Sequence, residues 1–260
     1  MDWLWSGSWF DAYAPEGFEA FTPSHALAIL GLIVCALLLW LTRGWVWSNK
    51  PVSEGIRWLL ITVLILSEVT LNIWYVAQHI WDVQTSLPLE LCSVTLLLSI
   101  LMLMFRSRWL YSVVLFAGIG GALQAVLTPN LAYAFPHYRF IHFFVAHSAI
   151  ILAALYMTWI AGLRPTWKSV GGVMLFLNGL ALMVWIVDRT FGANYMFLTG
   201  KPSTPSILDV LGPYPVYILA EEVIALLFFS LLMLLFEVLP GGRLYVRLRK
   251  GAVHGADRAL

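Results

Sequence analysis

The chain has 260 residues, of which 61% are hydrophobic and 11% charged, and its formal net charge is +1. Because soluble domains average about 25% charged residues, this composition excludes an ordinary soluble protein, and the near-neutral charge argues against nucleic acid as a partner. Apolar runs long enough to cross a bilayer, about 20 residues, recur along the chain. The sequence therefore predicts an all-α, polytopic membrane protein.

The first stretch, residues 1–23, is rich in aromatic residues and has no basic residue ahead of an apolar core. It is typical of an extracytoplasmic, interfacial segment and not of a secretory signal. Residues 24–239 form the predicted transmembrane domain, and residues 240–260 form a basic cytoplasmic tail suited to anionic lipid. Breakers such as "TRGWVWSNKP", "FRSRW" and "LTPNLAYAFPH" separate the apolar runs. Seven transmembrane helices are predicted, at about residues 24–42, 57–79, 87–105, 109–127, 139–162, 169–187 and 214–239.

Lysine and arginine are distributed unevenly over the predicted loops. Of the 15 such residues, only Arg139, Arg189 and Lys201 fall on the side of the N-terminus. Because basic residues favour the cytoplasmic side, the N-terminus is predicted outside and the C-terminus inside. The twelve basic residues on the cytoplasmic side are Arg43, Lys50, Arg57, Arg106, Arg108, Arg164, Lys168, Arg243, Arg247, Arg249, Lys250 and Arg258.

Polar residues gather near the predicted outer ends of the helices. Five of the six histidines lie there, and the stretch "FPHYRFIHFFVAHSAI" alone holds three of them. Residues that recur every three or four positions share one face of a helix, and ionisable residues inside a membrane usually have a function. We therefore expect one polar pocket open to the outer leaflet. Its expected members are Glu68, Asn72, Tyr75 and His79 on the second span; Cys92, Thr95 and Ser99 on the third; Gln124 and Thr128 on the fourth; His142 and His147 on the fifth; and Asp188, Arg189 and Glu221 near the outer ends of the last two.

Two chemistries fit such a pocket. In the first, a histidine takes the proton of Cys92, and the thiolate attacks a lipid ester to form a thioester. Arg139, Arg189 or Lys201 would then hold the headgroup phosphate. In the second, histidines from several helices bind zinc, which activates water. The latter is harder to build, because His142 and His147 are five residues apart and diverge on an ideal helix.

A third interpretation is not enzymatic: the pocket of a seven-helix protein would hold a lipid or another ligand. The two cysteines do not suggest a disulfide, since Cys35 lies in the middle of the first span. The long connection at residues 189–215 is either a lid over the pocket or a cover that only packs.

Three stretches carry a resemblance to a known family: "SLPLELCSVTLLLSI", "FPHYRFIHFFVAHSAI" and "NYMFLTGKPSTPSILDVLGPYPVYIL". In this order they resemble bacterial YwaF-like integral membrane proteins, distant relatives of the eukaryotic transmembrane protein 164. That relative is a cysteine-dependent phospholipid acyltransferase, and more distant androgen-regulated membrane hydrolases use Thr and His.

The resemblance implies that Cys92 is the nucleophile, with His147 or His142 as its base. It also implies a phospholipid or lysolipid substrate and a place in the bacterial cytoplasmic membrane. We expect neither a cofactor nor a bound metal. Residues expected to contact substrate are Arg139, His79, Asn72, Glu68, Asp188, Arg189 and Glu221.

Overall fold

The computed structural model describes residues 9–13, 17–202 and 207–238. Throughout these residues every regular element is a helix, so the predicted all-α class is confirmed. The predicted cytoplasmic tail at 240–260 lies outside the described residues, as do residues 1–8 and 14–16 of the predicted N-terminal segment. Six helical stretches in the described part are long and apolar enough to cross a membrane: α1 (Pro23–Ser48), α2 (Lys50–Ala77), Arg108–Leu127, α6 (Tyr138–Trp159), α7 (Trp167–Phe191) and α8 (Val216–Val238).

The third predicted span is the exception. The structure has an apolar helix there, α3 (Leu91–Phe105), but its 15 residues are too few for a full crossing. It starts four residues later than predicted because residues 87–90 form turns and bends, in which the Leu89 N–H donates to the Leu87 carbonyl over 2.8 Å. The coarser prediction of a multi-pass helical protein is confirmed.

Local sequence explains where the helices stop and restart. A single residue, Asn49, separates α1 from α2, and its side chain accepts the Val52 N–H of the new helix. α3 ends at Arg106 in the left-handed conformation, and Ser107 then accepts the Leu110 N–H of α4 (Arg108–Val113). These short connections turn the chain back on itself, so α1 and α2 are antiparallel, and so are α3 and α4.

The fourth predicted span is interrupted by a π-helical turn. α4 leads into η2 (Val114–Gly118), a wider turn, and then into α5 (Ile119–Leu127). All five residues of η2 are buried, and the turn contacts both α3 and α6. The fourth span is therefore irregular where it is most buried. π turns of this kind interrupt otherwise regular helices and often occur at functional sites.

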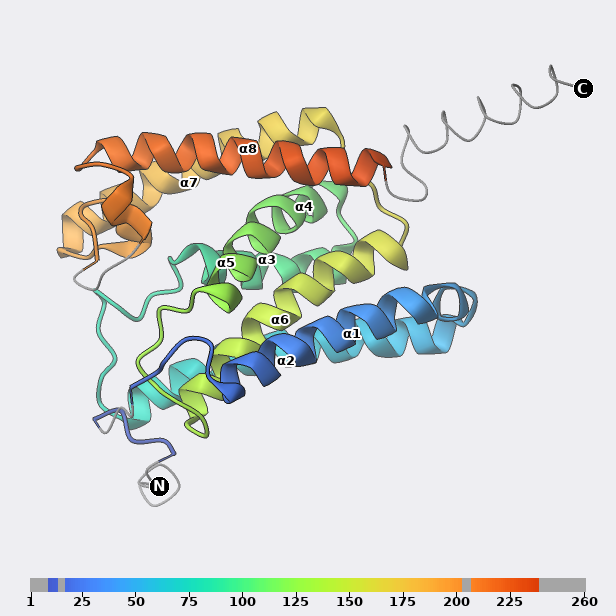
Figure 1. Cartoon of the computed structure of the whole chain (residues 1–260), viewed down its shortest axis with the longest axis horizontal. Coiled ribbons are helices and arrows are strands. Elements are labelled where there is room, and N and C mark those ends of the chain that lie inside the picture. The colour runs from blue at the N-terminus through green and yellow to red at the C-terminus, as the bar shows by residue number, and fades with distance from the viewer. Residues whose placement is uncertain (1–8, 14–16, 203–206, 239–260) are drawn as a thin grey trace, which may run out of the picture.

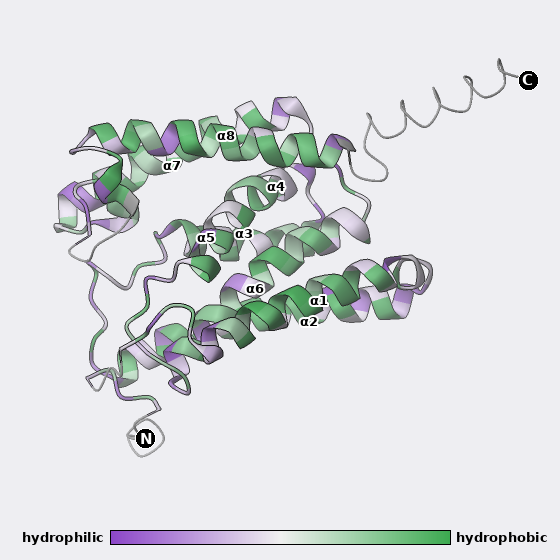
Figure 2. Ribbon diagram, in the orientation of Figure 1, coloured by the Kyte–Doolittle hydropathy of each residue, from purple (hydrophilic) through white to green (hydrophobic). Residues whose placement is uncertain are grey.

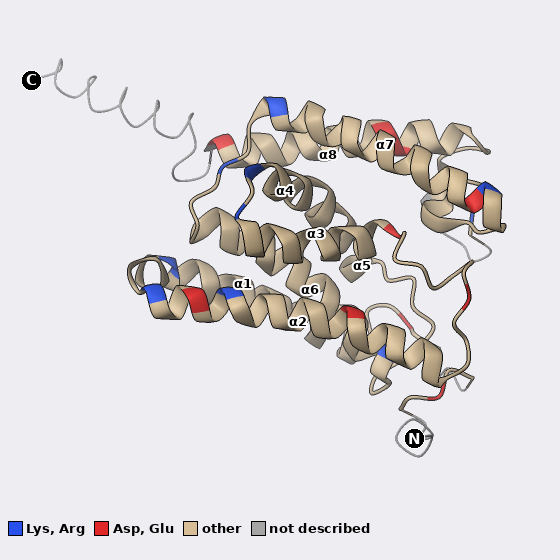
Figure 3. Ribbon diagram, turned by 180° about the vertical axis from the view of Figure 1, so that it is seen from behind, with Lys and Arg blue, Asp and Glu red and all other residues tan. Residues whose placement is uncertain are grey.

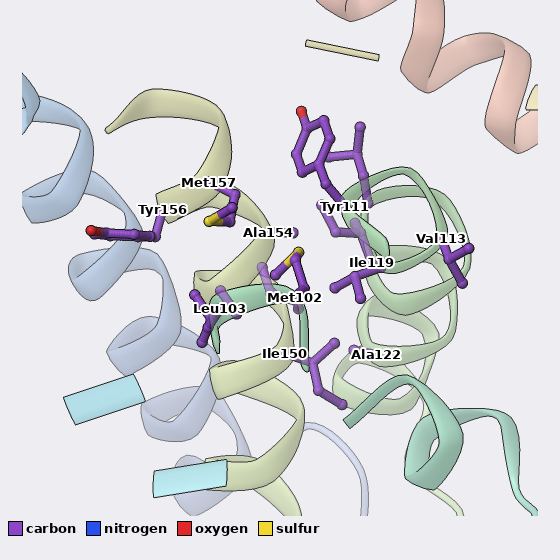
Figure 4. Packing of buried hydrophobic residues seen from close by; sticks show 14 of the residues in the cluster. Met102, Leu103, Tyr111, Val113, Ile119, Ala122, Ile150, Ala154, Tyr156 and Met157 are labelled. Atoms are coloured by element: carbon purple, nitrogen blue, oxygen red, sulfur yellow. The ribbon is translucent and has the colours of Figure 1, made fainter. Parts of the chain in front are cut away.

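The helices form two groups around this centre (Figure 1). The pair α1 and α2 lies on one side with α6, the pair α7 and α8 lies on the other, and α3, α4 and α5 lie between them. α6 contacts α1, α2, α3 and α5, so it is the central helix. Figure 4 shows the packing between α6 and its neighbours, with Ile150, Ala154 and Met157 of α6 facing residues of α3, α4 and α5. Apolar residues cover most of the helical length (Figure 2), as a lipid-facing surface requires.

α3 and α6 run in the same direction. Near their C-terminal ends both contact the start of α2: Arg57 Nη1 donates to the Leu103 carbonyl over 3.0 Å, and the Ser53 and Tyr156 hydroxyls are 2.9 Å apart. The N-terminal halves of α3 and α6 therefore lie together at the opposite end of the bundle. That end carries Cys92 and the histidines of α6.

Candidate functional site

Cys92 is the second residue of α3 and is half-buried. Its sulfur faces α5 at a glycine: a Cβ placed on Gly121 would be 3.5 Å from Cys92 Sγ. The next turn of α3 is tied to it, because the Thr95 hydroxyl donates to the Cys92 carbonyl over 3.2 Å. The thiol therefore lies at the interface between α3 and α5, and the nearest backbone on the α5 side carries no side chain.

One turn deeper, a second glycine joins three helices. A Cβ on Gly118 would be 3.5 Å from Thr95 Cβ and 3.2 Å from Ile150 Cγ2 of α6. Thr95 and Ile150 are thus at a similar depth, both close to Gly118. Residues three apart share a helix face, and α3 and α6 are parallel. Cys92 and His147 lie three residues earlier on the two helices, so they too are at a similar depth, and Gly121 faces Cys92 from α5.

The imidazole of His147 has a defined protonation pattern. Its Nδ1 is 2.6 Å from the carbonyl oxygen of Phe143, one turn earlier in α6. A carbonyl only accepts hydrogen bonds, so Nδ1 carries the proton and donates it. The lone pair of a neutral imidazole is then on Nε2. The ring also packs on Phe143, with centroids 4.2 Å apart. His147 therefore has the form that a general base needs.

His142, the alternative base, has both ring nitrogens engaged. Its Nε2 donates to the Ser67 carbonyl of α2 over 2.9 Å, and its Nδ1 accepts from Arg139 Nη1 over 3.2 Å. A neutral imidazole has one donor and one acceptor, so this ring has no free position for a proton. In the described structure, His142 links α6 to α2 and orients Arg139.

Two further histidines have structural contacts at both nitrogens. His25 of α1 is fully buried, accepts the Phe21 N–H at Nδ1 and donates from Nε2 to the Val126 carbonyl over 2.8 Å. His137 accepts the Arg139 N–H and donates to the Asp11 carbonyl, so it caps the start of α6. Burial lowers the pKa of His137 below its ordinary value, which favours the neutral form that this cap requires.

Arg139 is the one cation of the outer half of α6. Its guanidinium lies over the rings of Trp74 and Tyr75 of α2, at 5.5 and 5.7 Å from their centroids. Its Nε is buried without a hydrogen-bond partner, and the described residues supply no carboxylate that pairs with it. A guanidinium with unused donors is suited to an anionic group.

An N-terminal strap covers this part of the site. It consists of residues 9–12. Each of these four residues has a backbone N–H or carbonyl that forms a hydrogen bond to the outer end of α2, to the outer end of α6 or to the segment before α6. Trp74 Nε1 donates to the Phe10 carbonyl, and the Tyr138 N–H donates to the Trp9 carbonyl, both over 2.7 Å. The Ala12 N–H donates to Gln78 Oε1 over 3.1 Å. The strap therefore closes the side of the site that is formed by α2 and α6.

The predicted polar stripe of α2 has mixed surroundings. Asn72 Nδ2 donates to Glu68 Oε1 over 3.1 Å, so these two half-buried side chains satisfy one another. Tyr75 lies under Arg139, whereas His79 is exposed beyond the end of the helix, in the left-handed conformation. Of the four residues of this stripe, Tyr75 is thus the one that contacts Arg139.

Ser99 of α3 donates to the Thr95 carbonyl, and Thr128 donates to the Gln124 carbonyl at the end of α5, so these predicted residues make contacts within their own helices.

The predicted residues Asp188, Arg189 and Glu221 lie on the α7–α8 side. Asp188 is buried and accepts the Tyr195 N–H at Oδ1 over 3.0 Å, which fixes the start of the connection between α7 and α8. Arg189 is exposed, and Glu221 is half-buried in α8. The connection reaches the N-terminus of α3, since the Met196 N–H donates to the Glu90 carboxylate over 3.2 Å. The connection therefore contacts Glu90, two residues before Cys92.

Within the described residues, no three His, Cys, Asp or Glu side chains come together as ligands for a metal ion. Cys35, the second cysteine, is exposed in the middle of α1, away from this site.

Sequence reasoning missed three features of the site. Gly121 faces the thiol, the strap of residues 9–12 covers Arg139, and the Phe143 carbonyl sets the His147 tautomer. The run "GIGG" at residues 118–121 was a usable signal, because small residues in membrane helices mark close approach. The other two depend on contacts between distant or main-chain atoms.

The model of the TMEM164 family matches residues 20–233 of the chain. That range includes α3, α5 and α6 with Cys92, Gly121 and His147. No curated protein and no solved structure matches the chain.

Proposed function

The chain belongs to the TMEM164 family, and on this premise we propose that it is an intramembrane acyltransferase that acts on membrane phospholipids through Cys92 and His147. The family is consistent with a membrane lipid acyltransferase. The observation that supports the choice of residues is the hydrogen bond from His147 Nδ1 to the Phe143 carbonyl. It leaves Nε2 as the basic nitrogen, at the depth of the thiol.

The proposed reaction has two halves. As Cys92 Sγ attacks the carbonyl carbon of a lipid ester, its proton passes to His147 Nε2, and a tetrahedral intermediate forms. The C–O bond then breaks, the proton moves from His147 to the departing lysolipid oxygen, and the acyl group remains on sulfur as a thioester. In the second half the hydroxyl of another lipid, or water, attacks the thioester, and His147 takes its proton. The C–S bond then breaks, and the proton passes from His147 to the Cys92 sulfur, which regenerates the free thiol.

Proton transfer to a neighbouring histidine matters especially in this environment. A charge in a membrane interior is costly. This mechanism avoids that cost, because it does not require a resting thiolate. The proton leaves sulfur only as the new bond forms, and it returns to the leaving oxygen. Net charge in the site is therefore kept small throughout the reaction.

Arg139 is proposed to bind the headgroup phosphate. Its guanidinium lies at His142, and five residues separate His142 from His147, which is about 7.5 Å along a helix. A phospholipid has its phosphate nearer the surface than its ester carbonyls, separated by the glycerol carbons. Arg139 lies nearer the surface than His147, as the phosphate lies nearer the surface than the ester carbonyls in the substrate. Rigid packing on Trp74 and Tyr75 would hold the guanidinium ready.

We also propose that α3 is a seventh membrane segment and that the N-terminus is outside. α3 is too short to cross fully, but residues 87–90 extend the segment, and its apolar sequence is packed among membrane helices. Figure 3 shows Lys and Arg concentrated at the end of the bundle that holds the α1–α2 and α3–α4 turns, which would be the cytoplasmic end. Cys92 and His147 would then lie in the outer leaflet.

The decisive experiment detects the thioester. Purified protein in vesicles of a defined diacyl phospholipid should gain the mass of one acyl chain on the peptide that contains Cys92, with release of an equal amount of lysolipid. Cys92→Ala should have neither signal, and Cys35→Ala should retain both, because Cys35 is exposed on α1. Full lipid turnover by Cys92→Ala would contradict the proposal.

A further inference from the structure

Three glycines of η2 and α5 face three different neighbours. A Cβ on Gly118 would be 3.2 Å from Ile150 and Val114, and one on Gly120 would be 3.1 Å from Phe228 of α8. Both distances are shorter than ordinary contacts, so these two glycines allow close packing of helices. Gly121 differs: its nearest atoms would be Leu91 Cδ2 at 3.4 Å and Cys92 Sγ at 3.5 Å. A methyl group fits there without strain, and it would rest on the thiol.

We propose that Gly121 forms the acyl-binding side of the thiol and limits the bulk next to the carbonyl of the acyl groups that Cys92 accepts. The inference rests on the proposed acyl transfer and adds a residue that determines its specificity. Gly121 would favour a straight-chain acyl group, unbranched beside its carbonyl. An acyl carbonyl must come within contact distance of sulfur to react. The space that a Gly121 side chain would occupy is the space that this group needs.

The sulfur has side chains near it on α3 and a bare backbone on α5. The Thr95 hydroxyl bonds to the Cys92 carbonyl, and the α7–α8 connection packs with Leu91 and Val94 of α3. Gly121 is the neighbour on the α5 side, and it has no side chain. An acyl group on the sulfur would lie along this glycine, with His147 of α6 at a similar depth.

The test uses both cysteines of the chain. Gly121→Ala and Gly121→Leu are purified beside the wild-type protein, and peptide mass spectrometry follows the reaction of N-ethylmaleimide with Cys92 and with Cys35. Cys35 is exposed on α1 and serves as the control within the same molecule. Reaction at Cys92 should slow in the order Gly, Ala, Leu, by at least ~10-fold for Leu, while reaction at Cys35 stays constant.

Two matched variants separate this effect from packing. Gly118→Ala and Gly120→Ala force contacts of 3.2 and 3.1 Å, so they should lower the melting temperature and leave the reactivity of Cys92 near wild type. Gly121→Ala should keep or raise the melting temperature, because alanine favours a helix and its methyl fits. A well-folded Gly121→Leu protein whose Cys92 reacts as fast as wild type would overturn the proposal.

The acyl specificity is tested with two small esters, p-nitrophenyl butyrate and p-nitrophenyl 2-methylpropanoate. Each transfers its acyl group to Cys92 sulfur with breakage of the ester C–O bond, and the thiol proton leaves with nitrophenol. Wild type should be acylated faster by the straight-chain ester, and Gly121→Ala should widen that preference. Equal rates for the two esters in both proteins would overturn the specificity. Maleimide reactivity that follows the size of residue 121, with no acylation by either ester, would show that Gly121 controls access to the thiol, and it would contradict both acyl transfer to Cys92 and the acyl specificity.

Discussion

At the scale of single residues, two histidines on one helix have different chemical states because their neighbours differ. His147 donates to the carbonyl one turn before it and has its lone pair at Nε2, whereas His142 donates to Ser67 of α2 and accepts from Arg139. Position along the helix alone does not separate them. The hydrogen-bond partners do, because an imidazole with both nitrogens engaged is not available as a base.

This difference predicts opposite effects of the same substitution at the two positions. His147→Gln should reduce formation of the Cys92 thioester by ~10²–10⁴-fold, the usual effect of removing a general base, with a small change in thermal stability. His142→Gln should retain thioester formation within about tenfold and lower the free energy of unfolding by about 1 kcal/mol, through loss of the bond to Ser67. Acyl-adduct mass spectrometry and thermal unfolding in detergent measure the two quantities. The prediction is wrong if the thioester persists in His147→Gln and disappears in His142→Gln.

The sequence allowed the location of the candidate residues to be predicted better than their contacts. Helical spacing and apolar runs were sufficient to place Cys92 and the histidines of α6 at one end of the bundle. The tautomer of His147 follows from a main-chain carbonyl, and the closure over Arg139 follows from residues 9–12, more than 120 positions earlier in the chain. Neither contact leaves a periodic signal in the residues concerned.

At the scale of elements, the α7–α8 connection is attached to the segment that leads into α3. The Tyr195 hydroxyl accepts the Leu87 N–H over 2.9 Å and donates to the Val83 carbonyl over 2.8 Å, and Tyr195 itself is buried. The connection thus fixes the start of the helix that carries Cys92. The sequence left open whether this connection is a lid or a packed cover. These contacts favour a packed cover for its residues 193–198.

Tyr195→Phe tests the role of this attachment. The substitution keeps the ring and removes the hydroxyl, so the Leu87 N–H and the Val83 carbonyl both lose a partner. We expect the free energy of unfolding to fall by about 1–3 kcal/mol, the range for a buried group left unsatisfied. Because the N-terminus of α3 is then less constrained, Cys92 should also react faster with N-ethylmaleimide, while Cys35 should not change. An unaltered melting temperature and unaltered reactivity at Cys92 would show that the hydroxyl is dispensable.

Element boundaries were the least predictable part of the fold, for physical reasons visible in α3. The run "SLPLELCSVTLLLSI" is apolar from its start, and hydropathy alone extends the helix through Leu87. The structure begins the helix at Leu91, after the turn at residues 82–86 and after Pro88, which lacks a backbone donor. The π turn of the fourth span is likewise invisible to hydropathy, because all of its residues are apolar or small.

At the scale of the whole molecule, charge and burial are arranged along the bundle axis and across it. Glu54 at the start of α2 pairs with Arg57 and with Arg106 of the α3–α4 turn, so the end opposite the site is held by ion pairs. Across the axis, α6 is the most buried of the candidate spans, whereas α1 and α8 are mostly exposed and would face lipid. The candidate site is thus at one end of the bundle and next to its central helix.

This arrangement makes membrane topology the last prediction. Basic residues of the α1–α2 and α3–α4 turns mark one end of the bundle as cytoplasmic, and the strap of residues 9–12, Arg139 and Cys92 belong to the other. In a Cys35→Ala, Cys92→Ala background, a single cysteine at Gln84, an exposed position before α3, should react in intact cells with a maleimide that does not cross membranes. A single cysteine at Lys168, exposed at the start of α7, should react only after the membrane is permeabilised. The reverse pattern would put Cys92 and His147 in the inner leaflet. Labelling of both positions from one side would mean that one of the three segments between them, for which the short α3 is the candidate, does not cross.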